Sequence, residues 1–360
     1  MKVAILGAGQ LGRMLALAGY PLGIACELYD QTAETPGGQV AKITAGAFDD
    51  YRKLTALARR ADVVTFDWEN VPVESLRVIL RSTPVYPQPA ALEVAQDRLL
   101  EKTAFGQLGI PTVGFAAVNT RADLDAAVLK LGLPGILKTR RFGYDGKGQV
   151  RIHRAADMGR AFAALAGQPL IYESFVNFSR EVSLIGVRGS TGETAFYPLT
   201  ENVHEQGILA TSRAPCRAGS LQASAERYMR SIFKKYKYVG VLAIEFFVAN
   251  GRLIANEMAP RVHNSGHWTI EGARTSQFEN HLRAICGLPL GDTSATGHAG
   301  MVNLIGRLPK KKTVLAVRGL HLHDYGKTEA RPGRKLGHLT LVTSSARSRD
   351  LALGRALKLR

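Results

Sequence analysis

The sequence predicts an α/β protein that begins with a parallel sheet, and three observations favour this class. Short apolar runs at residues 2–6, 24–29 and 63–66 alternate with helical segments, as in sheets whose parallel strands are linked by helices. A glycine turn at residues 7–12 joins the first strand to the first helix. The hydrophobic content of 46% and the charged content of 21% are those of an ordinary folded protein.

The rest of the chain mixes helices and strands. The pattern predicts helices over residues 91–108, 121–131 and 155–166, with Thr120 as an N-cap. It predicts strands over residues 133–137, 150–152, 169–175, 181–185, 238–248 and 252–258. No apolar run approaches the ~20 residues that a membrane span needs. Three cysteines without metal-ligand spacing indicate a reduced protein, so we expect a cytoplasmic location and no membrane partner.

The net charge of +17 is high for an enzyme that acts on small molecules. Residues 307–360 hold 14 lysines and arginines against three acidic residues. Nucleic-acid binding is one interpretation of this tail. The alternative, which we favour, is a solvated basic face, because the basic residues are dispersed and lack interleaved aromatic residues. We therefore expect no specific nucleic-acid partner.

A glycine-rich loop, GYDGKGQ at residues 143–149, follows Lys138 and lies between two predicted strands. Glycines allow backbone N–H groups to approach a polyanion closely, and lysines supply positive charge. The loop therefore predicts a site for the phosphates of a nucleotide, with a plain hairpin turn as the alternative. It is not a Walker A loop, because GxxxxGK followed by Ser or Thr is absent.

Two predicted strands near residue 250 carry Glu245 on one side and Asn256 and Glu257 on the other, with Asn250-Gly251 as a hairpin turn. A strict two-residue turn would place Glu245 opposite Asn256. A bulge or a longer loop would bring Glu245 and Glu257 together. Either register sets oxygen ligands across one hairpin, as Mg²⁺ requires.

The turn GAGQLG at residues 7–12 matches the GxGxxG fingerprint, with Asp30 eighteen residues after Gly12. Nicotinamide dinucleotide binding is one interpretation of this match. The same strand, turn and helix can also close any open parallel sheet or hold another phosphate. An oxidoreductase built on this turn would give no role to Lys138, Glu245 or Glu257.

Together the motifs resemble the ATP-grasp superfamily, and most closely the N5-carboxyaminoimidazole ribonucleotide synthases. The resemblance is carried by GQLGRM at 9–14, ENVP at 69–72, QDRLLEK at 96–102, GYDGKGQ at 143–149, FYPLTENVHEQGIL at 196–209, NEMAPRVHNSGHWT at 256–269 and RPGRKLGH at 331–338. It implies an ATP-grasp fold with an N-terminal Rossmann-like domain and a small C-terminal β-rich region. The implied parts are residues 1–94, a small subdomain at 95–169, and a large subdomain with the substrate-binding region at 170–360.

The resemblance also implies residue roles. ATP would be bound by Arg98, Lys138, the loop residues Gly143, Tyr144, Asp145, Gly146, Lys147, Gly148 and Gln149, the adenine hinge Glu173, Ser174, Phe175 and Val176, the ribose ligand Glu181, and His204, Asn256 and Glu257. Mg²⁺ would be held by Glu245 and Glu257. The reacting groups would be met by Tyr144, Asp145, Lys147, Arg331, Arg334 and Lys335. The ribonucleotide would be bound by Gln10, Leu11, Glu69, Asn70, Arg261, His263, Asn264, Ser265, Arg331 and Lys335.

The implied reaction is the carboxylation of aminoimidazole ribonucleotide with ATP and bicarbonate in purine biosynthesis, by a homodimer. The alternative within the superfamily is a formate-using glycinamide ribonucleotide transformylase, which would share the ATP residues but not RPGRKLGH. The chain departs from the family pattern at two places. Phe142 stands where many relatives carry a second glycine, and Phe66-Asp67-Trp68 replaces an aromatic–glutamate–phenylalanine run before Glu69.

Overall fold

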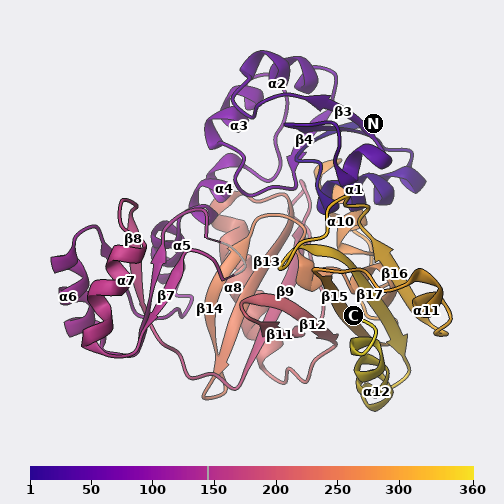
Figure 1. The fold of residues 1–360 in the computed structure, drawn as a ribbon. Coiled ribbons are helices and arrows are strands. Elements are labelled where there is room, and N and C mark those ends of the chain that lie inside the picture. The colour runs from indigo at the N-terminus through magenta and orange to yellow at the C-terminus, as the bar shows by residue number, and fades with distance from the viewer. Residues whose placement is uncertain (144–145) are drawn as a thin grey trace.

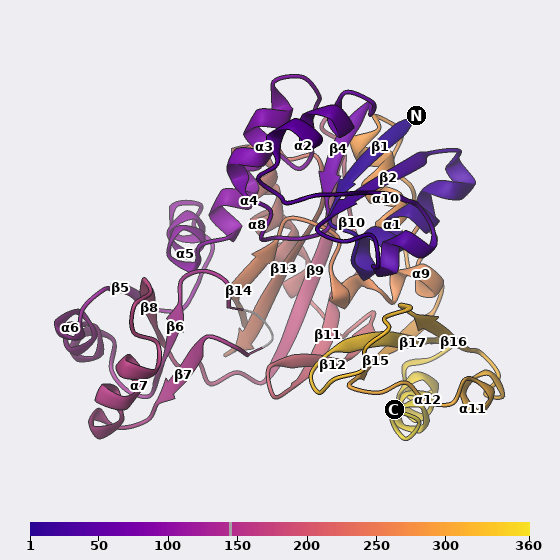
Figure 2. The same ribbon diagram turned by 45° about the horizontal axis from the view of Figure 1, so that its top comes forward.

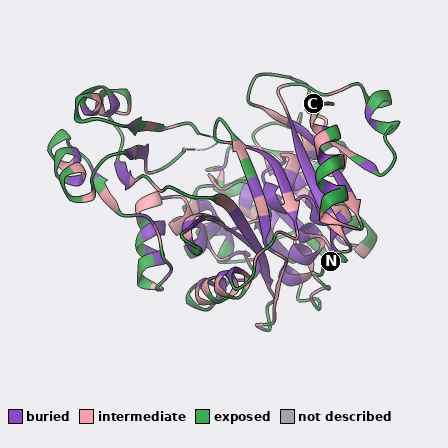
Figure 3. Ribbon diagram, turned by 90° about the horizontal axis from the view of Figure 1, so that it is seen from below, coloured by how far each residue is buried: buried purple, intermediate pink, exposed green. Residues whose placement is uncertain are grey.

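The protein, in a computed structural model that describes residues 1–143 and 146–360, is built on three sheets. Figure 1 shows the N-terminal sheet at the top, a small sheet at the left, and a large sheet across the centre and right. In Figure 2 the large sheet runs below the N-terminal part and continues into the C-terminal strands. Figure 3 shows that the large sheet is mostly buried, whereas the outer helices carry the exposed residues.

The N-terminal sheet confirms the predicted alternation of strands and helices. Its order is β3-β2-β1-β4, and all neighbouring strands are parallel. The elements are β1 (Lys2–Leu6), α1 (Gln10–Gly19), η1 (Tyr20–Leu22), β2 (Ala25–Asp30), η2 (Pro36–Gln39), β3 (Lys42–Ala45), α2 (Tyr51–Ala58), β4 (Val63–Phe66) and α3 (Val73–Leu80). Apart from the exposed Lys2 at the start of β1, all residues of β1 and β4 are buried, so both faces of this sheet are covered. The carboxyl ends of β1 and β4 lead into residues 7–12 and 67–72, which border the candidate site.

The small sheet has the order β5-β8-β6-β7 with antiparallel neighbours. Its elements are β5 (Phe115–Val118), α6 (Arg121–Leu131), β6 (Gly135–Thr139), β7 (Gln149–Ile152), η3 (Ala155–Asp157), α7 (Met158–Ala164) and β8 (Leu170–Ser174). Thr120 caps α6 as predicted, and its side chain accepts a hydrogen bond from the Asp123 N–H. The glycine loop connects β6 to β7, so the predicted strand–loop–strand is confirmed.

The large sheet has the order β14-β13-β9-β11-β12-β15-β17-β16, and β10 pairs with β9. Its strands are β9 (Arg180–Arg188), β10 (Thr194–Phe196), β11 (Thr200–Glu205), β12 (Ile208–Ala214), β13 (Gly240–Ala249), β14 (Arg252–Ala259), β15 (His298–Ile305), β16 (Leu320–Asp324) and β17 (Lys335–Thr343). The helices among them are α8 (Leu221–Tyr236), η4 (Asn264–Gly266), α9 (Thr269–Gly272), α10 (Gln277–Ile285), α11 (Lys311–Leu315) and α12 (Ala346–Leu357). The C-terminal strands are therefore continuous with the large sheet.

One predicted helix is wrong. The segment expected as a single helix over residues 91–108 forms two helices, α4 (Pro89–Ala95) and α5 (Arg98–Gln107). The break comes at Asp97, where the backbone is extended. The Asp97 side chain caps α5 by accepting hydrogen bonds from the N–H groups of Leu99 and Leu100. A second helix, α5, therefore begins after Asp97, and Arg98 lies in its first turn.

The position of β8 is relevant to the predicted boundary between the small and large subdomains. It pairs with β5 and β6, so the small sheet extends to Ser174, past the expected boundary at residue 169. A boundary after Ser174 would keep this sheet whole, and the division into domains stays a prediction. In the described part of the chain, no helix combines the length and apolar character needed to cross a bilayer.

Candidate active site

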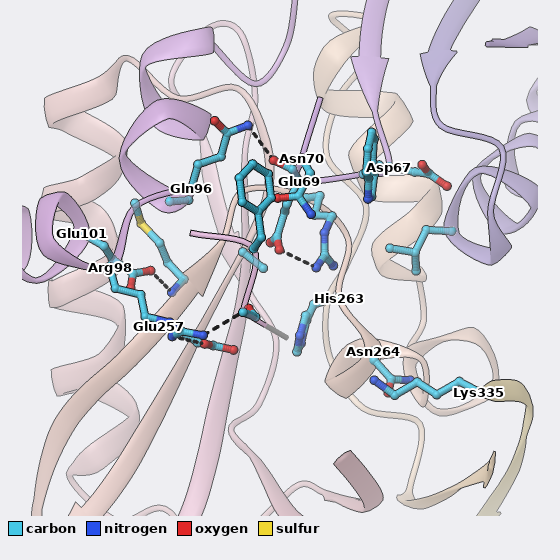
Figure 4. Close-up of a pocket in the computed structure, with 18 of the residues that line it drawn as sticks. Asp67, Glu69, Asn70, Gln96, Arg98, Glu101, Glu257, His263, Asn264 and Lys335 are labelled. Carbon is cyan, nitrogen blue, oxygen red and sulfur yellow. Dashed lines mark hydrogen bonds and ion pairs between the residues drawn. The ribbon is translucent and has the colours of Figure 1, made fainter. Parts of the chain in front are cut away.

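Two cavities meet between the three sheets, and they share Arg98 and Glu257. The larger, about 540 Å³, lies toward the N-terminal sheet and is lined by Gln10, Leu11, Asp67, Trp68, Glu69, Asn70, Ala95, Gln96, Arg98, Glu101, Arg140, Phe142, Gly143, Glu257, Met258, Ala259, Arg261, His263, Asn264 and Lys335. The smaller, about 220 Å³, lies between the small and large sheets and is lined by Arg98, Val113, Ile136, Lys138, Gly146, Lys147, Gln149, Arg151, Glu173, Ser174, Phe175, Val176, Phe178, Glu181, His204, Gly207, Glu245, Phe247, Asn256 and Glu257. Figure 4 shows the larger cavity.

The smaller cavity collects the residues expected to bind a nucleotide. Lys138 lies near the end of β6 and Gln149 begins β7, and the two residues are paired across the hairpin. Gly146 and Gly148 adopt φ values of 77° and 70°, which favour glycine. A Cβ atom on Gly148 would lie 2.6 Å from the Thr139 Oγ1, so the loop packs closely on its own stem. The expected loop residues Tyr144 and Asp145 lie outside the described residues.

Lys138 is held by a buried carboxylate. Its Nζ lies 2.6 Å from the Glu173 Oε2, and the Lys102 Nζ lies 3.3 Å from the Glu173 Oε1. Burial lowers the pKa of Lys138, although Glu173 opposes this. Burial disfavours the charged form of Glu173, but Lys102 and Lys138 outweigh it and lower its pKa to about 2. The Glu173 side chain is thus engaged with two lysines, whereas Ser174, Phe175 and Val176 continue along the cavity wall.

The smaller cavity is also lined by Glu181 and His204, two further residues expected to bind the nucleotide. The His204 Nδ1 lies 2.6 Å from the Glu181 Oε2, which joins β11 to β9. Burial lowers the pKa of His204, but the hydrogen bond to Glu181 and the charge of Glu245 outweigh it and raise that pKa overall. The raised pKa favours the protonated form of His204 beside the acidic hairpin.

The hairpin of β13 and β14 resolves the register that the sequence left open. Asn250 and Gly251, with φ values of 50° and 72°, form a two-residue turn. The register then shifts next to Glu245, which pairs with Glu257 instead of Asn256. The bulge interpretation is thus the correct one, and the two carboxylates stand side by side on one face.

These carboxylates fit a hard cation. Both line the smaller cavity. Burial and the charge of Glu257 raise the pKa of Glu245 to about 7. Burial also disfavours the charged form of Glu257, but Arg98 and Lys138 outweigh it and lower its pKa. Two adjacent carboxylates are a donor set that Mg²⁺ prefers. Among the residues that the structure describes, no group of three His, Cys, Asp or Glu side chains gathers as a metal site.

Arg98 lies where the two cavities join. Its Nη1 is 3.2 Å from the Glu257 Oε2, and its Nη2 donates to the Gly143 carbonyl at 3.2 Å. Figure 4 shows the guanidinium turned toward Glu257 from the start of α5. One side chain thus connects α5, the glycine loop and the acidic hairpin.

The larger cavity collects residues expected to bind the ribonucleotide. The Arg261 Nη2 lies 3.0 Å from the Glu69 Oε2. Gln96 donates to the carbonyls of Glu69 and Val71, which fixes the ENVP loop against α4. The remaining expected residues on this wall are Gln10, Leu11, Asn70, His263, Asn264 and Lys335.

Two neighbours of this wall, Ser265 and Asn303, are not among the described residues that line the cavity. Ser265 is fully buried, and its Oγ lies 2.9 Å from the His263 Nδ1, so it supports His263 from behind. Asn264 and Asn303 exchange two amide hydrogen bonds, at 3.1 and 2.7 Å. These contacts fix the side chains of His263 and Asn264, which both line the cavity.

The basic motif at residues 331–335 is only partly in the site. Lys335 is among the described residues that line the larger cavity. Arg331 is exposed, and the Arg334 Nη1 lies 3.1 Å from the Glu329 Oε2. The structure therefore brings Lys335 to the other predicted residues, whereas Arg331 and Arg334 are not among the described residues that line either cavity.

Comparisons with known proteins agree with this arrangement. The ribonucleotide synthetase preATP-grasp domain matches residues 1–96, the ATP-grasp domain matches 103–278, and the phosphoribosylaminoimidazole carboxylase C-terminal domain matches 299–350. The N5-carboxyaminoimidazole ribonucleotide synthase of Pseudomonas aeruginosa is 51% identical over 95% of this chain and 94% of that protein. The chain belongs to the N5-carboxyaminoimidazole ribonucleotide synthase family.

Solved structures of this family share the whole fold. The N5-carboxyaminoimidazole ribonucleotide synthetase of Thermus thermophilus has a TM-score of 0.95 and 52% identity, covering 99% of this chain and 98% of that one. The enzyme of Aspergillus clavatus, in complex with ADP and 5-aminoimidazole ribonucleotide, has a TM-score of 0.93 and 30% identity, with 99% and 98% covered. The predicted ATP-grasp fold is confirmed.

In this member of the N5-carboxyaminoimidazole ribonucleotide synthase family, carboxylates of the chain itself occupy the GxGxxG turn. The Ala8 N–H donates to the Asp30 Oδ2 at 2.8 Å, and the Gly12 N–H donates to the Asp67 Oδ2 at 2.7 Å. A Cβ atom on Gly7 would lie 1.6 Å from Asp67, so the turn is built around that carboxylate. Two of the N–H groups near a pyrophosphate site are therefore already used, which disfavours the dinucleotide interpretation.

The sequence reasoning missed several residues of this site. Gln96, Glu101 and Lys102 belong to the QDRLLEK motif, which was recognised, but only its Arg98 was given a role. Asp67 was noted only as a departure from the family pattern, although it holds the start of α1. Phe142 lines the larger cavity with φ 61°, a left-handed conformation that costs a non-glycine residue about 1 kcal/mol. The signal for Gln96, Glu101 and Lys102 was their place inside a recognised motif, and the signal for Asp67 and Phe142 was their departure from the family pattern.

Proposed function

We propose that the chain is an ATP-dependent carbon–nitrogen ligase that carboxylates 5-aminoimidazole ribonucleotide to N5-carboxyaminoimidazole ribonucleotide with bicarbonate, in purine biosynthesis. The observation that carries this proposal is the pair of cavities joined at Arg98 and Glu257. One cavity suits a nucleotide and the other a ribonucleotide, so a phosphoryl group can pass between them without entering water. The relatives named as this synthase support the same reaction.

The nucleotide would lie in the smaller cavity. Lys138, Arg98 and the N–H groups of the glycine loop supply positive charge for its phosphates. Backbone groups at Ser174–Val176 are suited to the adenine, and Glu181 to a ribose hydroxyl. His204 and Asn256 would border the nucleotide, and Glu173 would act through Lys138. Glu245 and Glu257 would hold Mg²⁺, which supplies charge neutralisation for the transferring phosphoryl group.

The reaction begins when an oxygen of bicarbonate attacks the γ-phosphorus of ATP. The bond to the leaving ADP oxygen breaks, and carboxyphosphate forms. Arg98 lies where this charge develops and is suited to stabilise it. Water must be excluded, because carboxyphosphate would hydrolyse, and the glycine loop is suited to cover it.

The ribonucleotide would lie in the larger cavity. Its 5-amino nitrogen forms a bond to the carboxyl carbon, and the bond between that carbon and the phosphate oxygen breaks. A base accepts the amine proton. Lys335, Arg261 and His263 border this position, with Gln10, Leu11, Glu69, Asn70 and Asn264 as further contacts and Ser265 behind His263. We also propose that the reacting groups or the substrate phosphate are contacted by Tyr144, Asp145, Lys147, Arg331 and Arg334. A cytoplasmic location and a homodimer are further parts of the proposal.

A second ligase of the superfamily would use the same nucleotide cavity with a different acceptor. The test is ADP release measured with aminoimidazole ribonucleotide or glycinamide ribonucleotide, each with bicarbonate and with formate. We expect release only with aminoimidazole ribonucleotide and bicarbonate together. Release with glycinamide ribonucleotide and formate would instead assign the transformylase reaction.

A further inference from the structure

The bulge in β14 decides whether the two cavity carboxylates face each other. From the turn inward, Ala249 pairs with Arg252 and Phe246 with Ala255. Continued without a shift, this register would place Glu245 opposite Asn256 and turn Glu257 to the other face, because side chains alternate along a strand. The shift at Asn256 reverses this, so the carboxylate pair exists only while the bulge is kept. A bulge leaves backbone groups without a ladder partner and needs support from elsewhere.

Two successive residues of α5 provide that support. The Lys102 Nζ donates to the Asn256 carbonyl at 2.9 Å. The Met258 N–H donates to the Glu101 Oε1 at 2.7 Å. These contacts reach the backbone immediately before and immediately after Glu257. Figure 4 shows Glu101 and Glu257 on neighbouring elements at the same end of the cavity.

The two side chains are deeply buried, at 2% exposure for Glu101 and 0% for Lys102. Burying an ammonium and a carboxylate is costly, and apolar residues of similar size often serve a core as well or better. A purely structural role does not explain why both polar groups end on the backbone that flanks one carboxylate. Lys102 also contacts Glu173 of β8, the carboxylate that pairs with Lys138. One lysine side chain therefore links β14 to β8.

We propose that Glu101 and Lys102 are positioning residues, which fix the bulge at Asn256 and thereby set Glu257 against Glu245 as a metal-binding pair. Glu101 lines the larger cavity, but its Oε1, like the Lys102 Nζ, contacts the backbone of β14. This inference rests on the assignment of these carboxylates to Mg²⁺ in the proposed function. It predicts that loss of either contact weakens metal binding more than nucleotide binding.

The test uses Mn²⁺ as the probe, with binding to the full-length protein in the presence of ADP followed by electron paramagnetic resonance. The variants are Lys102→Met and Glu101→Met, which keep the length of the side chain and remove the polar contact. Glu101→Gln keeps an oxygen acceptor for the Met258 N–H and serves as the conservative rescue. Lys130→Met, on the exposed surface of α6, is the matched control.

We expect Lys102→Met and Glu101→Met to weaken Mn²⁺ binding at least tenfold, with ADP binding in the absence of metal within about threefold of the parent protein. Glu101→Gln and Lys130→Met should bind Mn²⁺ within about twofold. Parent-like Mn²⁺ binding in both folded Met variants would overturn the proposal. Failure of both Met variants to fold, judged by circular dichroism and thermal melting, would also overturn it, because the pair would then be core support.

The measurement separates this proposal from the proposed function, because it uses neither bicarbonate nor a ribonucleotide. A protein that did not carboxylate aminoimidazole ribonucleotide could still show the expected loss of Mn²⁺. Conversely, full carboxylation with unaltered Mn²⁺ binding in the variants would overturn only the role of Glu101 and Lys102. No binding of Mn²⁺ by the parent protein with ADP would overturn the metal assignment on which the inference rests.

Discussion

Arg98 and Glu257 form an ion pair of 3.2 Å at the place where the two cavities meet. Arg98 comes from the first turn of α5 and Glu257 from the bulged strand β14, so the contact joins distant parts of the sequence. It also brings the acidic hairpin of β13 and β14 next to the glycine loop through the Gly143 carbonyl. The chemistry we propose takes place around this pair.

The first prediction concerns the acidic hairpin. Glu245→Gln and Glu257→Gln should each lower the rate of ADP formation at least ~100-fold, because removing one group that stabilises transition-state charge costs about that much. The amide keeps the shape of each side chain, so the fold should survive. Glu93→Gln, at a half-exposed position of α4 where Glu93 pairs with Arg77, is the control and should retain its rate. Near-normal turnover of Glu257→Gln at saturating Mg²⁺ would remove the metal assignment.

The buried pair of Lys138 and Glu173 predicts a loss of stability. Glu173→Gln would leave Lys102 and Lys138 buried without their shared carboxylate, and breaking such a pair costs about 3–5 kcal/mol of unfolding free energy. Asp125→Asn removes an exposed pair with Arg121 on α6 and should cost less than about 0.5 kcal/mol. Urea unfolding of the two variants measures this difference, and equal losses would contradict it.

Asp67 predicts a dependence of stability on pH. Burial, with the charge of Asp30 adding to it, raises its pKa from 3.8 to about 7, although hydrogen bonds from Gly12 and Gly9 oppose this. The folded state therefore binds this proton more tightly than the unfolded state. The stabilisation contributed by protonated Asp67 is fully present below pH 3.8 and is lost as the pH rises through about 7.

Asp67→Asn cannot ionise and keeps an acceptor for the Gly12 N–H. Relative to the parent protein, this variant should gain roughly 2–3 kcal/mol of unfolding free energy between about pH 5 and about pH 8. Comparison within one pair of proteins removes the contribution of other titrating groups. A difference that stays constant over this range would show that Asp67 has an ordinary pKa.

The basic C-terminal region predicts weak, salt-sensitive binding of nucleic acid. Several of its charges are paired within the protein, such as Lys311 with Asp324 and Arg349 with Asp350. Any binding should come from counterion release, so the affinity should fall steeply with added salt and be the same for unrelated sequences. Fluorescence anisotropy at two salt concentrations measures this. A salt-resistant, sequence-selective complex would contradict it.

Much of the fold and of the site could be predicted from the sequence, because periodicity and glycine turns are local signals. The alternation of β1, α1, β2 and β4 and the loop between β6 and β7 are of this kind. The break at Asp97 was missed, because apolar periodicity continued through it while the capping side chain decided the structure. The register at Glu257 was left open, because it depends on contacts from Glu101 and Lys102, more than 150 residues away in sequence. Such tertiary contacts leave no local pattern.

The central claim is that phosphoryl transfer to bicarbonate precedes carboxylation, and isotope transfer tests it most directly. With ¹⁸O-labelled bicarbonate, ATP and aminoimidazole ribonucleotide, the oxygen that attacks the γ-phosphorus stays with the phosphate when the carboxyl group moves to the amine. Mass spectrometry of the released phosphate should therefore find one ¹⁸O atom per phosphate, with one carbamate formed per ADP. Release of ADP and unlabelled phosphate would contradict the account, because water would then be the group that accepts the phosphoryl.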